Sequence, residues 1–163
     1  MRGLVLFVAG ILVGSAVQAG LAQSAPSNTG IVGMNHVGIA AANLDDTVAF
    51  YTQKMGFKEA FRTRNEQGQT QLVFIQTNRN TFIELAQATA QRPAGFTHVG
   101  IHVEKMPEAV KLFQSRGLMF TEPRLSVPVG STQASITDPN GLRVELTELP
   151  PASLQRKAMD AWR

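Results

Sequence analysis

Alternating apolar and polar positions predict two similar sets of strands, and each set contains one amphipathic helix. In both sets the order is strand, helix and then three further strands. The first set is predicted as a strand at 32–40, a helix at about 43–55, and strands at 57–64, 71–76 and 81–86. The second set is predicted as a strand at 97–103, a helix at about 107–116, and strands at 119–122, 131–137 and 142–149.

Turn and helix-end residues mark the boundaries of these elements. Asn43 or Asp45 is suited to cap the first helix, and Gly56 is expected to end it in the left-handed conformation. Residues 87–95 are expected to link the two sets, and the loop at 124–130 is a candidate rim of a site. The first helix is expected to bury Val48, Tyr51 and Met55.

A repeated motif connects the two sets. His-Val-Gly-Ile occurs at 36–39 and again at 98–101, an offset of 62 residues. Glu84 follows His36 by 48 residues, and Glu145 follows His98 by 47. A repeat of this length, tied to two histidines and two glutamates, indicates two copies of one structural unit.

Side chains alternate between the two faces of a strand, so the motif also predicts which residues share a face. Val37 and Ile39 lie on one face, which is apolar and suited to packing against helices. His36 lies on the opposite face beside small residues, and the same parity applies to His98, Glu84 and Glu145. If the two units pack about a pseudo-twofold axis, these four side chains can meet. Imidazole and carboxylate are ligands of divalent first-row metals.

The sequence resembles the vicinal oxygen chelate superfamily, which includes glyoxalase I, methylmalonyl-CoA epimerase, extradiol dioxygenases and fosfomycin-resistance thiol transferases. The resemblance implies an α+β fold: two βαβββ modules in one chain, forming a curved mixed sheet around a metal site. It covers 32–149 as one domain, with modules at 32–90 and 96–149. It rests on both His-Val-Gly-Ile strands, Phe50-Tyr51, Gly56-Phe57, the Asp138-Pro139-Asn140-Gly141 turn and Val144-Glu145-Leu146.

The resemblance implies one divalent metal ion, Zn, Ni, Co, Mn or Fe, held by His36, Glu84, His98 and Glu145. Dioxygenases and thiol transferases of the family use three protein ligands, whereas glyoxalase I uses four and the epimerase commonly has Gln at the second position. Glu84 therefore favours an isomerase, epimerase or lyase that acts on a small carbonyl compound by proton transfer through a metal-bound enediolate. Glu84 or Glu145 is the expected base.

Other residues on the same face have two interpretations each. His102 is either a catalytic group, as a partner of the ligands, a proton relay or a substrate contact, or a rim histidine in water. Arg143 either meets an anionic substrate group or is a solvated strand-end residue. Phe74, Phe82 and Met119 either line a pocket or pack in the core.

Two alternative functions have the same fold. One is a metal-free ligand-binding protein of the bleomycin-resistance kind, and the other is an extradiol dioxygenase or thiol transferase. The expected partners are a small-molecule substrate and a second copy of the chain in a homodimer. The net charge of +3 is dispersed without a basic run, so nucleic acid is not an expected partner. The chain has no cysteine, which excludes disulfides and thiol chemistry.

Both ends of the chain lie outside the predicted domain. Residues 1–22 have the pattern of a secretory signal peptide, with Arg2, an apolar run at 4–13 and small residues after it. The alternative is an uncleaved membrane anchor, but the run is shorter than the roughly 20 residues of a spanning helix. Residues 23–31 are expected to be a flexible lead. The tail at 150–163 is expected to form a short basic helix that packs on the body or on a second subunit through Leu154, Ala158 and Trp162.

An exported protein, periplasmic or secreted and free of the membrane after cleavage, is therefore expected. This location is in tension with glutathione thioesters and CoA esters as substrates, because both are mainly cytosolic.

Cleavage of the signal peptide predicts a mature protein that begins at Gly20 or Gln23, after the Val17-Gln18-Ala19 or Gly20-Leu21-Ala22 cleavage site. N-terminal sequencing of the protein purified from its native host measures this directly. Intact Met1 on soluble cytoplasmic protein would contradict the prediction.

Overall fold

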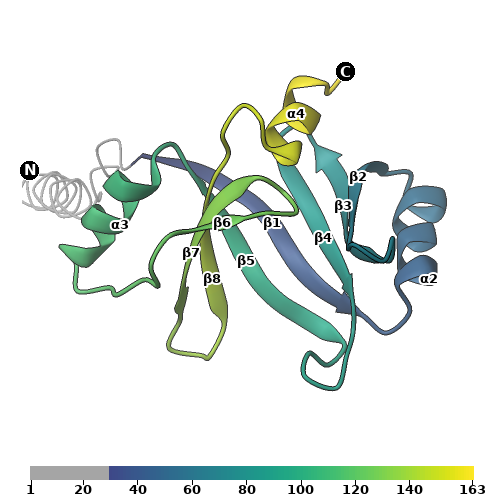
Figure 1. The fold of residues 1–163 in the computed structure, drawn as a ribbon, viewed down its shortest axis with the longest axis horizontal. Helices are drawn as coiled ribbons and strands as arrows, with labels where there is room; N and C mark the ends of the chain where they lie inside the picture. Colours follow the sequence, from purple (N-terminus) through teal and green to yellow (C-terminus); the bar gives the residue numbers. More distant parts are fainter. Residues whose placement is uncertain (1–29) are drawn as a thin grey trace, which may run out of the picture.

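A single curved sheet of eight strands forms the body of the protein in the computed structural model, which describes residues 30–163 (Figure 1). The predicted signal peptide and the lead up to residue 29 lie outside the described residues. The strands are β1 (Ile31–Ala41), β2 (Lys58–Arg64), β3 (Thr70–Asn78), β4 (Thr81–Gln87), β5 (Gly95–Val103), β6 (Arg124–Ser126), β7 (Ser131–Thr137) and β8 (Arg143–Glu148). The helices are α2 (Leu44–Ala49), α3 (Met106–Gln114) and α4 (Leu154–Asp160), and α2 continues into a π-helical segment, η1 (Phe50–Lys54).

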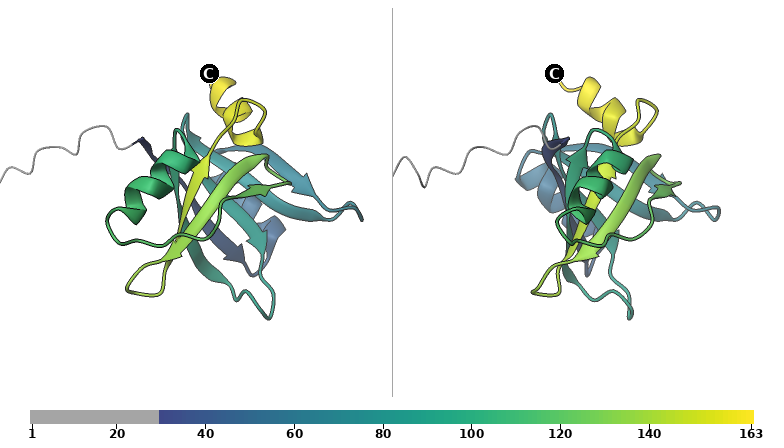
Figure 2. Two further views of the ribbon diagram at one scale, coloured as in Figure 1. Left: turned by 60° about the vertical axis from the view of Figure 1, so that its left-hand side comes forward. Right: turned by 90° about the vertical axis from the view of Figure 1, so that its left-hand side faces the viewer.

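The strand order β2-β3-β4-β1-β5-β8-β7-β6 divides the sheet into two equivalent halves. β1 is parallel to β4 in the first half, β5 is parallel to β8 in the second, and β1 and β5 pair antiparallel between them. Figure 2 shows how the two halves curve. The predicted α+β fold of two βαβββ modules in one mixed sheet is confirmed.

The helices α2 and α3 cover the outer face of the sheet, as the strand parity predicted. One buried cluster joins α2 to the outer face of the first module through Leu44, Val48 and Leu85, and Ile39 and Ile83 pack against it. The equivalent cluster joins α3 to the second module through Met106, Ala109 and Leu146. A third cluster contains Phe74, Phe82, Val129, Leu149 and Met159. Phe74 and Phe82 are therefore core residues.

The pairing of β1 with β5 places each motif histidine opposite the motif glycine of the other strand. His36 is opposite Gly100, and Gly38 is opposite His98. A Cβ atom on Gly38 would overlap the ring of His98, and a Cβ atom on Gly100 would overlap the ring of His36. Both glycines are required because each histidine ring lies against the bare backbone of the neighbouring strand.

Three local predictions were wrong in detail. The first helix changes to the wider π-helical turn after Ala49, and this rotates Met55 into solvent, where it is 50% exposed. Residues 119–122 form no strand, and Met119 is 71% exposed. Arg124–Ser126, predicted as a loop, pairs with β7 as a strand. Thr121 N also donates to Ser135 O of β7 at 2.8 Å, and Pro123, which has no N–H to donate, separates this bond from the ladder of β6.

The tail forms the predicted helix on the body of the same chain, but with a different buried face. α4 buries Gln155 and Met159, whereas Leu154 and Trp162 are only partly buried. Ser153 caps the helix by accepting a hydrogen bond from Arg156 N at 3.3 Å. Sequence periodicity missed this face because Gln155 is polar and is buried through a hydrogen bond. No helix within residues 30–163 has the length and apolar character needed to cross a membrane.

Replacing Gly100 by Ala is expected to displace the ring of His36 and lower the free energy of unfolding by about 1–3 kcal/mol, the cost of overpacking. Denaturant unfolding measures the loss, and the NMR signals of the His36 ring measure the displacement. Gly68→Ala is the control, because Gly68 has φ +77° but open space around it, so it strains the backbone without touching a histidine. Unchanged His36 signals in Gly100→Ala would contradict the contact.

Candidate metal centre

Three side chains from three strands bring their donor atoms together in the middle of the sheet. His36 of β1 and His98 of β5 face each other with their Nε2 atoms 2.9 Å apart. Glu84 Oε2 of β4 lies 3.7 Å from His36 Nε2 and 3.9 Å from His98 Nε2. All three donor atoms lie within 4.8 Å of one another, an arrangement able to hold one metal ion.

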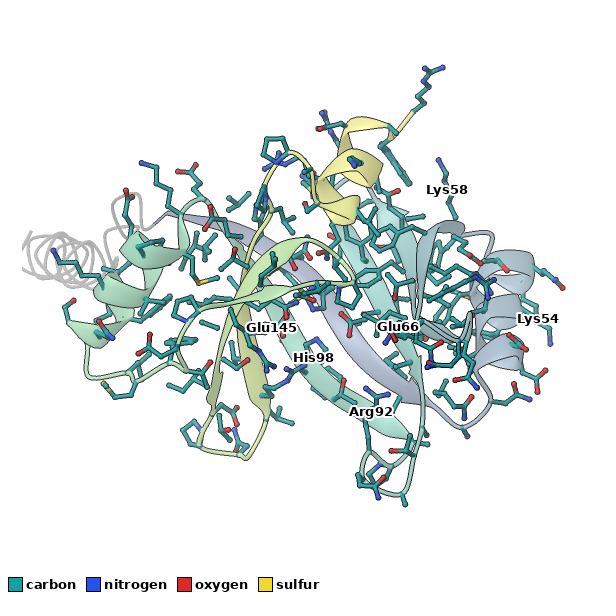
Figure 3. The ribbon with its side chains drawn as sticks, viewed as in Figure 1. Lys54, Lys58, Glu66, Arg92, His98 and Glu145 are labelled. Carbon is teal, nitrogen blue, oxygen red and sulfur yellow. The ribbon has the colours of Figure 1, made fainter. Side chains whose placement is uncertain are left out.

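Glu145 of β8 approaches the same group of donors from the other side. Its Oε1 atom lies 3.6 Å from His36 Nε2, and its Oε2 atom lies 3.2 Å from the guanidinium of Arg143. Figure 3 labels Glu145 and His98 near the middle of the sheet. Glu145 Oε1 is buried and has no hydrogen-bond partner in the described residues. A buried acceptor without a partner costs about 1–3 kcal/mol. A cation among the four donors would satisfy this oxygen.

Both histidines are neutral at physiological pH. Burial, with the nearby His98 and Arg143, lowers the pKa of His36 to about 3. Burial, with the nearby Arg143 and Arg92, lowers the pKa of His98 to about 4. Their contacts with the glutamates are therefore not ion pairs, and the rings are in the neutral form that coordinates metals.

Neighbouring amides fix the orientation of the His36 ring. Asn35 Nδ2 donates to the backbone oxygen of Asn80 at 3.4 Å, which turns Asn35 Oδ1 toward His36 Nδ1 at 2.9 Å. Gln155 Nε2 of α4 donates to the same Oδ1 atom at 2.6 Å. Because Asn35 Oδ1 is an acceptor, His36 carries its proton on Nδ1 and directs the Nε2 lone pair at the other donors. Such outer partners orient metal ligands.

The neighbour of His98 is less restrictive. Thr97 Oγ1 lies 2.9 Å from His98 Nδ1, and a hydroxyl can donate or accept. Since His36 Nε2 has the lone pair, His98 Nε2–H donates to it. Thr97 can then donate to His98 Nδ1, or accept from it if a cation displaces the Nε2 proton.

Burial makes both carboxylates harder to ionise. Burial, together with repulsion from Glu145, raises the pKa of Glu84 to about 7. Burial also raises the pKa of Glu145, against the attraction of Arg143 and Arg124. Two acidic groups that resist ionisation beside two neutral imidazoles form an environment that a divalent cation would stabilise.

The donor set fits one ion in both spacing and chemistry. Ligands at about 2.0–2.2 Å from a common ion lie about 3–4 Å apart, which matches the separations of 2.9 to 3.9 Å among the donor atoms of His36, His98 and Glu84. Glu145, predicted as the fourth ligand, comes within 3.6 Å of His36 Nε2 but is not part of this three-residue group. Two nitrogen and two oxygen donors without sulfur suit Zn, Ni, Co, Mn or Fe.

A pocket of about 270 Å³ opens onto these donors. Glu84 and His98 line it together with two arginines, Arg92 from the link between modules and Arg143 from β8. Arg143 was considered from the strand parity, whereas Arg92, Asn35 and Gln155 were not predicted. Asn35 alone had a signal, as the polar neighbour of a motif histidine.

His102 is not brought to these donors. It lies four residues from His98 along β5, about 13 Å at the rise of a strand, and it lines a different pocket. Phe74 does contact the site, since its ring lies edge-on to His36 with 6.2 Å between centroids.

Known proteins share both this fold and this sequence pattern. A model of the Glyoxalase/Bleomycin resistance protein/Dioxygenase superfamily matches residues 33–146. An uncharacterised protein of Bacillus subtilis (strain 168), YwkD, is 27% identical over 123 residues, which are 71% of this chain and 95% of that protein.

Solved structures of methylmalonyl-CoA epimerases have the same fold. The enzyme from Mycobacterium tuberculosis has a TM-score of 0.65 at 23% identity, over 80% of this chain and 95% of that one. A variant of the Streptomyces coelicolor enzyme in complex with 2-nitronate-propionyl-CoA has a TM-score of 0.60 at 22% identity, over 72% and 97%. With the family model spanning both modules, the chain belongs to the glyoxalase/bleomycin resistance protein/dioxygenase superfamily.

Proposed function

We propose that this protein is a divalent-metal-dependent isomerase, epimerase or lyase that moves a proton next to the carbonyl group of a small anionic compound. The observation that carries the proposal is the presence of two glutamates with different surroundings beside one pair of neutral histidines. Structural neighbours that are epimerases support the same class of reaction. A metal-free binding protein would not need a buried carboxylate oxygen without a hydrogen-bond partner.

The four donors have separate roles in this proposal. His36 and His98 hold the ion together with the two carboxylates, and Glu145 is suited to stay bound throughout because its side chain is 3% exposed and pairs with Arg143. Glu84 is the more accessible carboxylate, with 15% of its side chain exposed and a position on the pocket wall. A divalent ion bound there supplies Lewis-acid polarisation of the carbonyl.

Glu84 acts as the base that takes the proton and returns it to the other face or to a neighbouring carbon. A carboxylate suits this role when burial raises its proton affinity, and burial raises the pKa of Glu84 in the metal-free site. Arg92 and Arg143 line the same pocket and supply two guanidinium groups for an anionic group of the substrate.

We also propose that the protein acts outside the cytoplasm, because of the signal-peptide pattern at its N-terminus. A substrate that carries its own carboxylate, rather than a CoA or glutathione carrier, is compatible with that location and with the two arginines. The homodimer expected from the resemblance stays a prediction.

Glu84→Gln is expected to slow turnover by roughly a hundredfold or more, the usual scale for loss of a general base, while much of the metal stays bound. Glu145→Gln is expected to weaken metal binding itself. Two measurements test this: elemental analysis, and NMR of deuterium uptake at the carbon next to the carbonyl in a panel of carboxylate-bearing carbonyl compounds.

Glu66→Gln, in the exposed hairpin turn, controls for the loss of one negative charge. Full deuterium exchange by Glu84→Gln would show that a group other than Glu84 transfers the proton. Wild-type protein that binds none of the five candidate metals would exclude the metal-dependent reaction altogether.

Gln155→Leu is expected to weaken metal binding by about 10- to 100-fold, the usual effect of losing an outer partner of a ligand histidine. The reason is that Gln155 and His36 share the same acceptor, Asn35 Oδ1. Competition with a chelator measures the dissociation constant. Lys157→Leu, on the exposed side of α4, is the matched control. Equal metal affinity in both variants would show that α4 has no influence on the centre.

A further inference from the structure

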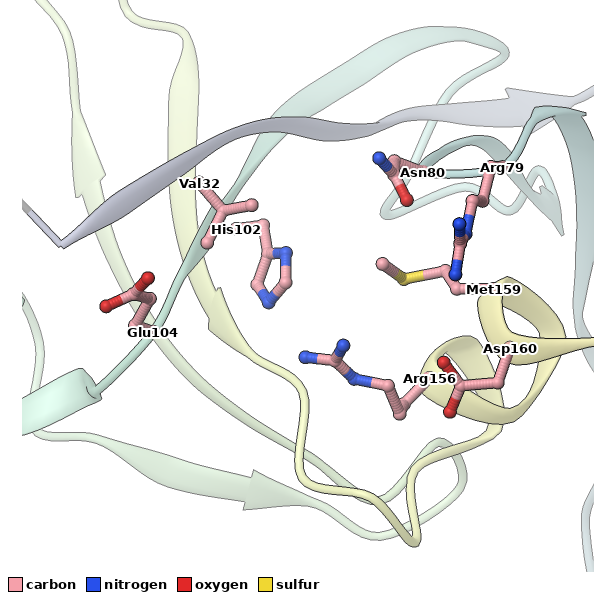
Figure 4. Close-up of a pocket in the computed structure, with 8 residues that line it drawn as sticks. All are labelled: Val32, Arg79, Asn80, His102, Glu104, Arg156, Met159 and Asp160. Atoms are coloured by element: carbon pink, nitrogen blue, oxygen red, sulfur yellow. The ribbon is translucent and has the colours of Figure 1, made fainter.

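A second pocket of about 410 Å³ lies under α4, separate from the candidate metal centre (Figure 4). β1 contributes to both pockets: Val32 near its start lines this one, and Ile39 near its end lines the one at the metal donors. The walls come from β1, β5, α4 and the turn between β3 and β4. The lining residues are Val32, Arg79, Asn80, His102, Glu104, Arg156, Met159 and Asp160.

His102 is the buried polar group of this pocket. Only 5% of the residue is exposed, yet its imidazole forms no hydrogen bond with any side chain or backbone group of residues 30–163. Figure 4 shows the ring directed into the pocket, facing Arg156. Burial and the nearby Arg156 lower the pKa of His102, so the neutral ring has one N–H to donate. The fully buried polar atoms without a partner in residues 30–163 do not include its ring nitrogens, so these nitrogens open onto the pocket, where they can meet an atom of a ligand.

Two arginines face the same space. Arg79 comes from the turn after β3, and Arg156 comes from α4. Neither forms an ion pair with a carboxylate in the described part of the chain. Arg156 donates one weak hydrogen bond, from Nε to Leu149 O at 3.4 Å, so its terminal nitrogens remain available. Planar guanidinium groups of this kind bind oxyanions through paired N–H donors.

Two acidic residues limit the charge that the pocket accepts. Glu104 and Asp160 also line it, so the formal charges of the wall balance. Figure 4 shows the Glu104 carboxylate turned away from His102 and Arg156, and the Asp160 carboxylate beside the Arg156 side chain. The positive groups therefore face the middle of the pocket, and the negative groups disfavour a ligand with several charges.

We propose that this pocket is a binding site for a small molecule with one oxyanion group, a phosphate or a carboxylate, held by Arg79, Arg156 and His102. The proposal is independent of the function proposed for the metal centre. It also gives His102 a role that does not involve the metal donors, since the ring would donate its N–H to an oxygen of the ligand.

Calorimetric titration of the purified metal-free protein with inorganic phosphate, and separately with acetate, tests the proposal. At least one of the two is expected to bind saturably at one site, and the stronger one identifies the oxyanion. Triphosphate is expected to bind no more tightly than phosphate, because of Glu104 and Asp160. Sodium chloride at matched ionic strength controls for screening. Heat that rises without saturation for both anions would overturn the proposal.

Variants locate the binding. Arg156→Gln and His102→Phe are each expected to weaken it by about tenfold or more, the scale of a hydrogen bond to a charged group, and Asp160→Asn is expected to strengthen it. Lys157→Gln removes one positive charge from the exposed side of α4 and is expected to change nothing. Arg92→Gln tests whether the anion binds in the pocket at the metal donors rather than in this one. Loss of binding in Arg92→Gln, with Arg156→Gln unchanged, would place the anion in the other pocket and overturn the proposal.

Discussion

The antiparallel pairing of β1 with β5 is the interaction on which the rest of the structure depends. It joins the two modules edge to edge, and its register sets each motif histidine against the glycine of the other strand. The outer strands then add one glutamate on each side, with Glu84 beside Gly38 and Glu145 beside Gly100. A slip of one residue would turn all of these side chains to the helix-covered face.

This pairing concentrates unfavourable chemistry in one place. Two neutral imidazoles and two carboxylates share a buried region, and the pKa values of all four are shifted toward the uncharged form, mainly by burial. Arg143 offsets part of this cost for Glu145, and Asn35 orients His36. A bound cation would offset the remaining cost of burying these four groups. Cation binding would therefore stabilise the fold.

The repeat explains why so much of this centre could be predicted from the sequence. The two histidines occupy equivalent positions of the repeat, as do the two glutamates. The repeat period and the alternation of side chains along a strand were therefore enough to predict that all four share a face. Arg143 follows the same parity, because it shares the Glu145 face of β8, whereas Arg92 does not, because it belongs to the irregular link between modules. Gln155 was missed since periodicity assigns buried positions to apolar residues, whereas its burial depends on a partner far away in the sequence. The strand predicted at 119–122 failed because this stretch bonds to β7 through Thr121, while Pro123, without an N–H, interrupts a continuous ladder before β6.

The hydrogen bond between Gln155 and Asn35 spans 120 positions of the chain. At about 5–20 residues per second, the ribosome adds the helix that carries Gln155 roughly 6–24 s after the strand that carries His36. During that interval both histidine strands can already pair, but the ring of His36 lacks one of the two groups that set its tautomer. The donors therefore reach their final arrangement only when α4 docks. The compartment in which this last helix folds would determine which cations compete for the centre.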